Sequence, residues 1–211
     1  TGKPIPLGGS LGRNEATARG VSIVTDLYVQ DQGKKPEDLT IAIQGCGNAG
    51  LTALRLLDEL GYKVVAISDS TAAVYNADGL DVKAIVAHRH PRQDLKDYSD
   101  DKGTTIMTNE ELLTLDVDTL IPAAMEDQIT EELAPRVRAK TIIEAANGPV
   151  TADAEKILNE RGITILPDIM CNSGGVTVSY FEWVQNLQHL RWSEEEVNEK
   201  LRGIMTQAYE T

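Results

Sequence analysis

One stretch near the start of the chain constrains the fold more than any other. The β-branched run at residues 40–44 leads into the glycine-rich turn at residues 45–50, and apolar residues then recur at helical spacing from Leu51 to Leu60, before Gly61. A strand, a G-x-G-x-x-G turn and a helix in this order are typical of a dinucleotide-binding βαβ unit.

Each glycine of the turn is predicted to have a different structural role. Gly45 permits the tight turn, Gly47 lets the backbone approach a pyrophosphate, and Gly50 allows the helix to pack closely on the strand. The N–H groups at the helix start, at Asn48 and Ala49, would then face the phosphates. Taken alone, the glycines would also fit an ordinary strand-to-helix turn.

A second predicted strand, at residues 63–67, supports the dinucleotide interpretation. It ends just before Asp69, nineteen positions after Gly50, where a carboxylate can accept hydrogen bonds from an adenosine ribose. Cys46 lies inside the turn, and nothing near it in the sequence would stabilise a thiolate. We therefore expect Cys46 to be a small buried side chain and not a reactive thiol.

Composition narrows the class of protein. The 211 residues include 20 Lys and Arg against 33 Asp and Glu, a formal charge of −13, which argues against nucleic acid or an anionic membrane as partner. No run approaches the roughly 18 consecutive apolar residues of a membrane span. Cys46 and Cys171 are far apart and form no metal pattern, so a reduced cytoplasmic setting is the simplest interpretation.

Strand and helix patterns alternate along most of the chain. This alternation predicts one α/β domain with a Rossmann-like, doubly wound, mostly parallel sheet covered by helices on both faces. Further strands are expected at residues 104–108, 118–122, 141–144 and 163–166. Helices are expected at residues 14–33 with Asn14 as N-cap, 80–88, 109–115, 127–134, 151–161 and, as one long helix, through Val176 to Leu190.

The remaining segments receive simpler interpretations. Residues 2–12 and 70–79 are predicted as loops, and residues 94–102 as a charged, exposed segment. Ser193 and Glu196 predict a capping box for a final helix. The aromatic residues of the preceding helix are expected to lie in the core; they are Tyr180, Phe181 and Trp183.

Ligands of parallel sheets bind beyond the carboxyl ends of the strands, and the loops there are rich in small and amide residues. Ala123, Ala124 and Asn147 follow predicted strands, and Asn172 precedes Gly174-Gly175 at the start of the long helix. Such residues suit a flat cofactor and its sugar hydroxyls, although turn chemistry explains them too. His88 and His90 invite a metal interpretation, but no third ligand is near, and a solvated helix end is preferred.

At this point the sequence carries a family resemblance. It resembles the cofactor domain of hexameric glutamate dehydrogenases and, more broadly, the glutamate, leucine, phenylalanine and valine dehydrogenase superfamily, over essentially the whole chain. The motifs that carry the resemblance are Thr1-Gly-Lys-Pro-Ile-Pro-Leu-Gly-Gly-Ser-Leu-Gly-Arg13, Glu15-Ala-Thr17, the turn at residues 45–50, Leu120-Ile-Pro-Ala-Ala124, Glu144-Ala-Ala-Asn-Gly-Pro149, Asn172-Ser-Gly-Gly-Val176 and Ser179-Tyr-Phe-Glu-Trp-Val-Gln-Asn186.

The resemblance implies roles for residues of this chain. Those expected to contact the cofactor are Gly45, Gly47, Asn48, Ala49 and Gly50 at the pyrophosphate, Asp69 and Ser70 at the adenosine ribose, Ala123, Ala124 and Asn147 at the nicotinamide ribose, and Thr17 and Asn172 at the carboxamide. Arg13 and Ser179 resemble the family's substrate contacts. Ser179 favours glutamate over an apolar amino acid, because a carboxylate needs a hydrogen-bond donor.

The chain also departs from the family's pattern. The family commonly has an aromatic residue at Cys46, Gly at Ala18 and Asn at Asp127, and often a lysine and two glycines after Asp69, where Thr71-Ala72-Ala73 stand here. Since a 2′-phosphate needs a nearby cation and would be repelled by Asp69, NAD is predicted as the preferred cofactor, with NADP as the alternative.

In the family, the catalytic lysine and aspartate belong to a separate N-terminal domain, whose glycine-rich lysine motif these 211 residues lack. The chain opens without Met, and its C-terminal helices look cut short, so we expect an excised domain at residues 1–211, without catalytic residues of its own. The parent enzyme, a homohexamer by resemblance, would convert L-glutamate to 2-oxoglutarate and ammonia. The alternatives are a free-standing nucleotide-binding module with a regulatory or structural role, and the cofactor domain of a leucine-type dehydrogenase.

Overall fold

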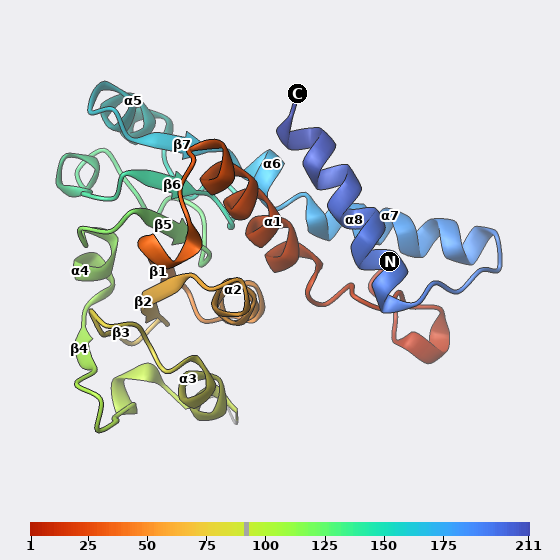
Figure 1. Ribbon diagram of the computed structural model, residues 1–211, viewed down its shortest axis with the longest axis horizontal. Helices are drawn as coiled ribbons and strands as arrows, with labels where there is room; N and C mark the ends of the chain where they lie inside the picture. Colours follow the sequence, from red (N-terminus) through yellow and green to blue (C-terminus); the bar gives the residue numbers. More distant parts are fainter. Residues whose placement is uncertain (91–92) are drawn as a thin grey trace.

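A computed structural model describes residues 1–90 and 93–211 and shows one seven-stranded sheet flanked by helices (Figure 1). The strand order is β4-β3-β2-β1-β5-β6-β7. The neighbouring strands β2, β1, β5, β6 and β7 pair in parallel. At one edge of the sheet, β3 pairs antiparallel with β2, and β4 pairs antiparallel with β3. The strands are β1 Thr40–Gln44, β2 Lys63–Ser68, β3 Ala73–Tyr75, β4 Thr105–Met107, β5 Thr119–Pro122, β6 Thr141–Ile143 and β7 Thr164–Leu166. The predicted doubly wound, mostly parallel α/β fold is confirmed.

Alternate residues of the strands enter two separate cores, one on each face of the sheet. Ile41 and Ile43 of β1 belong to the core on one face, and Ala42 between them belongs to the other. The first core is covered by α1 Ala16–Asp31, α2 Asn48–Glu59, α3 Val82–Arg89, α6 Asp168–Cys171, α7 Gly174–Leu187 and α8 Glu194–Tyr209. The second is covered by α4 Asn109–Leu113 and α5 Ala152–Glu160.

Helix α1 lies between the sheet and the pair formed by α7 and α8 (Figure 1). It packs on α2 on one side and on both C-terminal helices on the other. Residues from the two ends of the chain are thereby brought to the edge where the parallel strands end.

The parallel register places the loops of a ligand site next to one another. Gln44, the last residue of β1, pairs with Pro122 of β5, and Ile43 pairs with Ile67 of β2. The strand order reverses direction between β1 and β5, and in open α/β sheets ligands bind in the crevice at such a point.

The predicted helix at residues 127–134 is wrong. Asp127 adopts a left-handed backbone, with φ of 55°, and its N–H donates to the carbonyl of Gly148 at 2.9 Å. Ile129 forms a bridge with Val150 instead of an intrahelical bond. The segment therefore pairs with the loop after β6, and its only helical part is a 3-10 turn at Ala134–Arg136.

Other expectations near the turns also need correction. The predicted loop at residues 70–79 contains β3, which forms a hairpin with β2, and the predicted loop at residues 2–12 contains a 3-10 turn at Ile5–Leu7. The segment at residues 94–102 is not wholly exposed, because Leu95 and Tyr98 are buried. Asn14 does not cap α1, whose N-cap is Glu15 without a side-chain cap bond.

The predictions for the C-terminal third of the chain are confirmed in part. The predicted capping box is present, since Ser193 accepts from the N–H of Glu196 while Glu196 accepts from that of Ser193. The long helix ends at Leu187 and leaves Leu190 outside. Phe181 is buried as expected, but Tyr180 and Trp183 are 56% and 54% exposed, so their assignment to the core is wrong. In the described part of the chain, every helix is too short or too polar to cross a bilayer.

Candidate functional site

The glycine turn leaves one side of its backbone open. Gly45 has φ of 100°, and a Cβ there would lie 2.9 Å from the backbone of Ala123. A Cβ on Gly50 would lie 1.9 Å from the carbonyl oxygen of Gly45, whereas one on Gly47 would meet no atom within 4 Å. Gly45 and Gly50 therefore shape the turn, and Gly47 borders free space where a pyrophosphate could approach.

Helix α2 begins inside the motif, at Asn48, three residues earlier than the apolar spacing predicts. Its first N–H groups lie beside the open face of Gly47, an arrangement that favours a negatively charged group. The Asn48 amide donates to the carbonyl of Asn14 at 2.6 Å and so ties the turn to the segment before α1. The Asn48 side chain is thus engaged within the protein.

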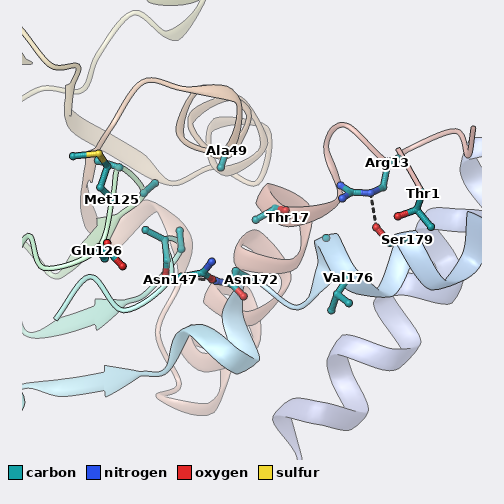
Figure 2. Close-up of a pocket in the computed structure, with 15 residues that line it drawn as sticks. Thr1, Arg13, Thr17, Ala49, Met125, Glu126, Asn147, Asn172, Val176 and Ser179 are labelled. Atoms are coloured by element: carbon teal, nitrogen blue, oxygen red, sulfur yellow. Dashed lines mark hydrogen bonds between the residues drawn. The ribbon is translucent and has the colours of Figure 1, made fainter. Parts of the chain in front are cut away.

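A cleft of about 950 Å³ runs along the ends of the strands (Figure 2). It brings together residues from α1, α2, the loops after β5 and β6, and α7. The predicted site residues that line it are Arg13, Thr17, Ala49, Ala123, Ala124, Asn147, Asn172 and Ser179.

Two asparagines lie together near the middle of this cleft (Figure 2). The Asn172 amide donates to the Asn147 carbonyl oxygen at 2.7 Å, so each amide fixes the other. The loop that carries Asn147 is held by Asp168, which accepts from the N–H of Gly148 at 2.8 Å. Glu144, buried below, in turn accepts from the N–H of Asp168, and burial raises the pKa of its carboxyl group. Prearranged amides of this kind can hold sugar hydroxyls or a carboxamide.

The far end of the cleft carries a cation and a hydroxyl group in contact. Arg13 donates from Nε to the Ser179 hydroxyl at 2.8 Å (Figure 2). Thr17 lies between this pair and the asparagines. Helix α7 passes close to Thr17 at Gly175, where a Cβ would lie 2.5 Å from the Thr17 hydroxyl oxygen. A positive charge beside hydrogen-bond donors is suited to a carboxylate ligand.

A second cleft, of about 530 Å³, continues from the glycine turn to the end of β2. Its lining includes Gly45, Gly47, Asp69 and Ser70, on the other side of Ala123 and Ala124 from the first cleft. Gly50 lines neither cleft, because it packs behind the turn. The two clefts share Ala123 and Ala124 in their linings, and a dinucleotide is a ligand long enough to occupy both.

The Asp69 carboxylate is already surrounded by donors from the protein. One oxygen accepts from the N–H and hydroxyl of Thr71 and from the N–H of Ala72, at 2.8, 2.7 and 3.1 Å. The other accepts from Leu95 N–H and from Arg89 Nη1, both at 2.8 Å. Although burial alone would raise the pKa of Asp69, the hydrogen bonds from Thr71, Leu95 and Ala72 lower it below its usual value.

Arg89 is the site residue that the sequence analysis missed. It lies in the last turn of α3, twenty positions after Asp69, and its side chain is only 15% exposed. No motif marks it, since its contact with Asp69 depends on how α3 packs beside the glycine turn. The adjacent His88 contributes to this packing, with Nε2 2.8 Å from the Asp94 carbonyl oxygen and its ring against Tyr98. Across residues 1–90 and 93–211, His, Cys, Asp and Glu form no group suited to a metal ion.

Cys46 lies beside Arg89 at the same turn. Its side chain is buried, as predicted, and burial raises the pKa of its thiol to about 11 despite the positive charge of Arg89. The thiol therefore stays protonated at neutral pH and adds no negative charge to the cleft.

The sequence of this chain was compared with models of known protein families. The sequence model of the Glutamate/Leucine/Phenylalanine/Valine dehydrogenase family matches residues 8–211. The chain belongs to this dehydrogenase family. The matched range contains the whole glycine turn and both clefts except Thr1.

Two glutamate dehydrogenases, one named NAD-specific and the other NADP-specific, have nearly the same sequence identity to this chain. The chain is 50% identical over 211 residues to the catabolic NAD-specific glutamate dehydrogenase RocG of Bacillus subtilis, and covers 49% of it. It is 48% identical over 210 residues to the NADP-specific glutamate dehydrogenase A1 of Halobacterium salinarum, and covers 50% of it. The chain spans about half the length of the curated relatives it matches.

Solved glutamate dehydrogenases share the fold. The hetero-hexameric enzyme from Thermus thermophilus, in a Leu-bound form, superposes with a TM-score of 0.91 at 31% identity, over all of this chain and 49% of that one. The enzyme from Peptoniphilus asaccharolyticus gives a TM-score of 0.82 at 40% identity, again over all of this chain and 48% of that one.

Proposed function

We propose that this chain is the cofactor-binding half of a glutamate dehydrogenase. The parent enzyme would oxidise L-glutamate to 2-oxoglutarate and ammonia, with the bound nicotinamide accepting a hydride from the α-carbon of the amino acid. The observation that carries the proposal is the continuous cleft that joins the glycine turn, the Asn147–Asn172 pair and the Arg13–Ser179 pair.

Each part of the cleft has a role in this proposal. The open face of Gly47 and the start of α2 take the pyrophosphate. Thr17, Asn147 and Asn172 orient the nicotinamide and its ribose. Ser179, oriented by Arg13, donates to the side-chain carboxylate of glutamate, which a leucine-type enzyme would not need.

The residues of proton transfer are proposed to lie in the half of the parent that precedes this one, and the parent is proposed to be a cytoplasmic homohexamer. The relatives that this chain matches are about twice as long, which supports the missing half. Catalysis depends on groups held in register with the substrate, so this chain alone should bind cofactor without turnover.

We further propose that NAD is the preferred cofactor. The Asp69 carboxylate is ionised at neutral pH and, paired with Arg89, borders the position expected for the adenosine ribose. A 2′-hydroxyl group is neutral beside this carboxylate, whereas a 2′-phosphate adds a second negative charge.

Calorimetric titration of the chain with NAD tests the proposal directly, alongside an assay of glutamate-dependent NAD reduction. We expect saturable binding of one NAD per chain and no reduction. In the parent-length enzyme, Ser179→Ala should raise KM for glutamate at least about tenfold, the loss expected when a charged group loses its donor. Absence of NAD binding, or efficient oxidation of leucine in place of glutamate by the parent, would contradict the proposal.

A further inference from the structure

Glu126 is held at the first cleft by the segment whose pattern had predicted a helix. The next residue, Asp127, has a left-handed backbone and donates from its N–H to the Gly148 carbonyl at 2.9 Å. The Gln128 side chain donates to the Glu126 carbonyl oxygen at 3.0 Å. Because Glu126 and Asn147 immediately precede the two bonded residues, the loop after β5 carries Glu126 beside the loop after β6.

The charges along the first cleft are separated. Among the described residues that line it, Glu126 has the one acidic side chain and Arg13 the one basic side chain. Figure 2 shows these two residues on opposite sides of Asn147 and Asn172. Glu126 is exposed, and within residues 1–90 and 93–211 its carboxylate forms no hydrogen bond or ion pair. Its negative charge at neutral pH is therefore available to a ligand of the cleft.

This negative charge bears on the cofactor and not on the amino acid. In the proposed function, Asn147 and Asn172 orient the nicotinamide and its ribose, while the glutamate carboxylate binds at the far end of the cleft, beside Arg13. The nicotinamide ring carries a positive charge when it is oxidised and none after it has accepted a hydride. A carboxylate in the same cleft attracts only the oxidised ring, and the attraction is stronger there than in bulk water because the effective dielectric constant is lower.

We propose that Glu126 is a specificity-determining residue for the oxidation state of the cofactor, and that its carboxylate favours oxidised NAD over NADH by at least about threefold in relative affinity. The inference rests on the proposed function, because it presumes that the nicotinamide lies between Glu126 and Arg13. The direction that Glu126 favours is glutamate oxidation, since the reduced cofactor is held less tightly and leaves more readily.

The test is calorimetric titration of the chain with oxidised NAD and with NADH at low salt, in the wild type and three variants. The readout is the ratio of the two dissociation constants, because both forms carry the same pyrophosphate and adenosine, so any effect of Glu126 on these groups cancels. Glu126→Gln should shift the ratio toward NADH by at least about threefold. Glu126→Asp keeps the charge and should retain most of the wild-type ratio. Glu131→Gln is the matched control, since Glu131 is exposed five positions further along, outside the lining of the cleft, and its loss changes the net charge equally; it should leave the ratio unchanged.

The outcomes separate this inference from the proposed function. A shift of the ratio smaller than about threefold in Glu126→Gln, or an equal shift in Glu131→Gln, would overturn the role of Glu126 and leave the cofactor site intact. The same ratio in Glu126→Asp as in Glu126→Gln would also overturn it, because the shape of the side chain and not its charge would then matter. Failure of the wild type to bind either form of the dinucleotide would overturn both proposals.

Discussion

Three glycines of one motif meet three different surroundings at the turn between β1 and α2. Gly45 needs a left-handed backbone against Ala123, and Gly50 packs against the carbonyl of Gly45. Gly47 has φ of −79°, which any residue adopts, and open space where its Cβ would lie. The fold therefore requires the first and third glycines, whereas the requirement for Gly47 comes from the proposed ligand.

The Gly47→Ala variant should separate folding from binding. We expect stability to be unchanged or higher by up to about 1 kcal/mol, because alanine loses less backbone entropy on folding. NAD affinity should fall at least about tenfold, because the methyl group occupies the side from which the pyrophosphate approaches. Urea unfolding and calorimetric titration measure the two effects. Gly203→Ala, within α8 and away from both clefts, is the control that should keep full affinity.

The Gly50→Ala variant should instead damage both properties. Its Cβ would lie 1.9 Å from a backbone oxygen, so α2 must move away from the turn. We expect a loss of about 1–3 kcal/mol of stability, the usual cost of overpacking, together with loss of NAD binding. Urea unfolding measures this loss, and wild-type stability would show that the close packing of α2 on the turn is not needed.

Single residues show where prediction from sequence ends. Asp69 could be placed at the end of β2 because the βαβ spacing fixes it. Its partner Arg89 could not, because their contact depends on the packing of α3, and the pattern at residues 88–90 is that of any solvated helix end. Similarly, Arg13 and Ser179 are 166 positions apart, and only the family resemblance linked them before the structure showed their hydrogen bond.

At the scale of elements, small residues allow α1 and α7 to cross closely. A Cβ on Gly174 would lie 2.2 Å from the carbonyl oxygen of Ala16, and a Cβ on Gly20 would lie 3.1 Å from the backbone of Gly174. This crossing sets the distance between Thr17 and the start of α7 and, one turn further along, between Arg13 and Ser179. The substrate end of the cleft thus depends on helix packing.

The Gly174→Ala variant tests that dependence. A methyl group forced against the backbone of α1 should displace α7 and destabilise the chain by about 1–3 kcal/mol. Because Asn172 and Ser179 move with this segment, NAD affinity should fall as well, although the glycine turn is untouched. Thermal unfolding and NAD titration are the measurements, and Gly203→Ala again serves as control. Normal NAD binding in a destabilised variant would show that the cleft tolerates the shift of α7.

The elements also differ in how well their patterns identify them. The parallel strands are short apolar runs between polar turns, and all of β1, β2, β5, β6 and β7 were predicted within about two residues, the usual uncertainty of element ends. The helix at residues 127–134 failed because its N–H groups bond to the loop after β6, a tertiary pairing that no local propensity reports. Strand β3 was missed because three residues in a tight hairpin carry too little periodicity.

At the scale of the whole molecule, the first residues of the chain are fastened to α7. Gly2 and Lys3 surround the side chain of Glu182, and Asn186 donates to the carbonyl of Gly8 at 2.7 Å. Gln185 donates to Ser10 in the same region, and Arg13 follows with its bond to Ser179. The segment that carries Arg13 into the cleft is therefore held by contacts with a helix from the other end of the chain.

Glu182 makes this attachment dependent on pH. Its side chain is fully buried, and although burial alone would raise its pKa, the Lys3 ammonium group and the N–H groups of Gly2 and Lys3 lower the pKa to about 2. Because the folded pKa lies below the ordinary value of 4.5, the stabilisation is complete above about pH 5 and is lost as the pH falls toward 2.

The isosteric variant Glu182→Gln isolates this contribution. At pH 7 it should be less stable than the wild type by about 1–2 kcal/mol, less than the lowered pKa alone implies because solvent screens the half-exposed Lys3. The difference should shrink toward zero between pH 5 and pH 2, as Glu182 of the wild type becomes protonated and resembles the amide. Urea unfolding at several pH values measures it, with Glu199→Gln on the exposed side of α8 as a control of equal charge change. A stability difference independent of pH would mean that Glu182 acts through packing and not through its charge, and the attachment of Arg13 to α7 would then survive acid.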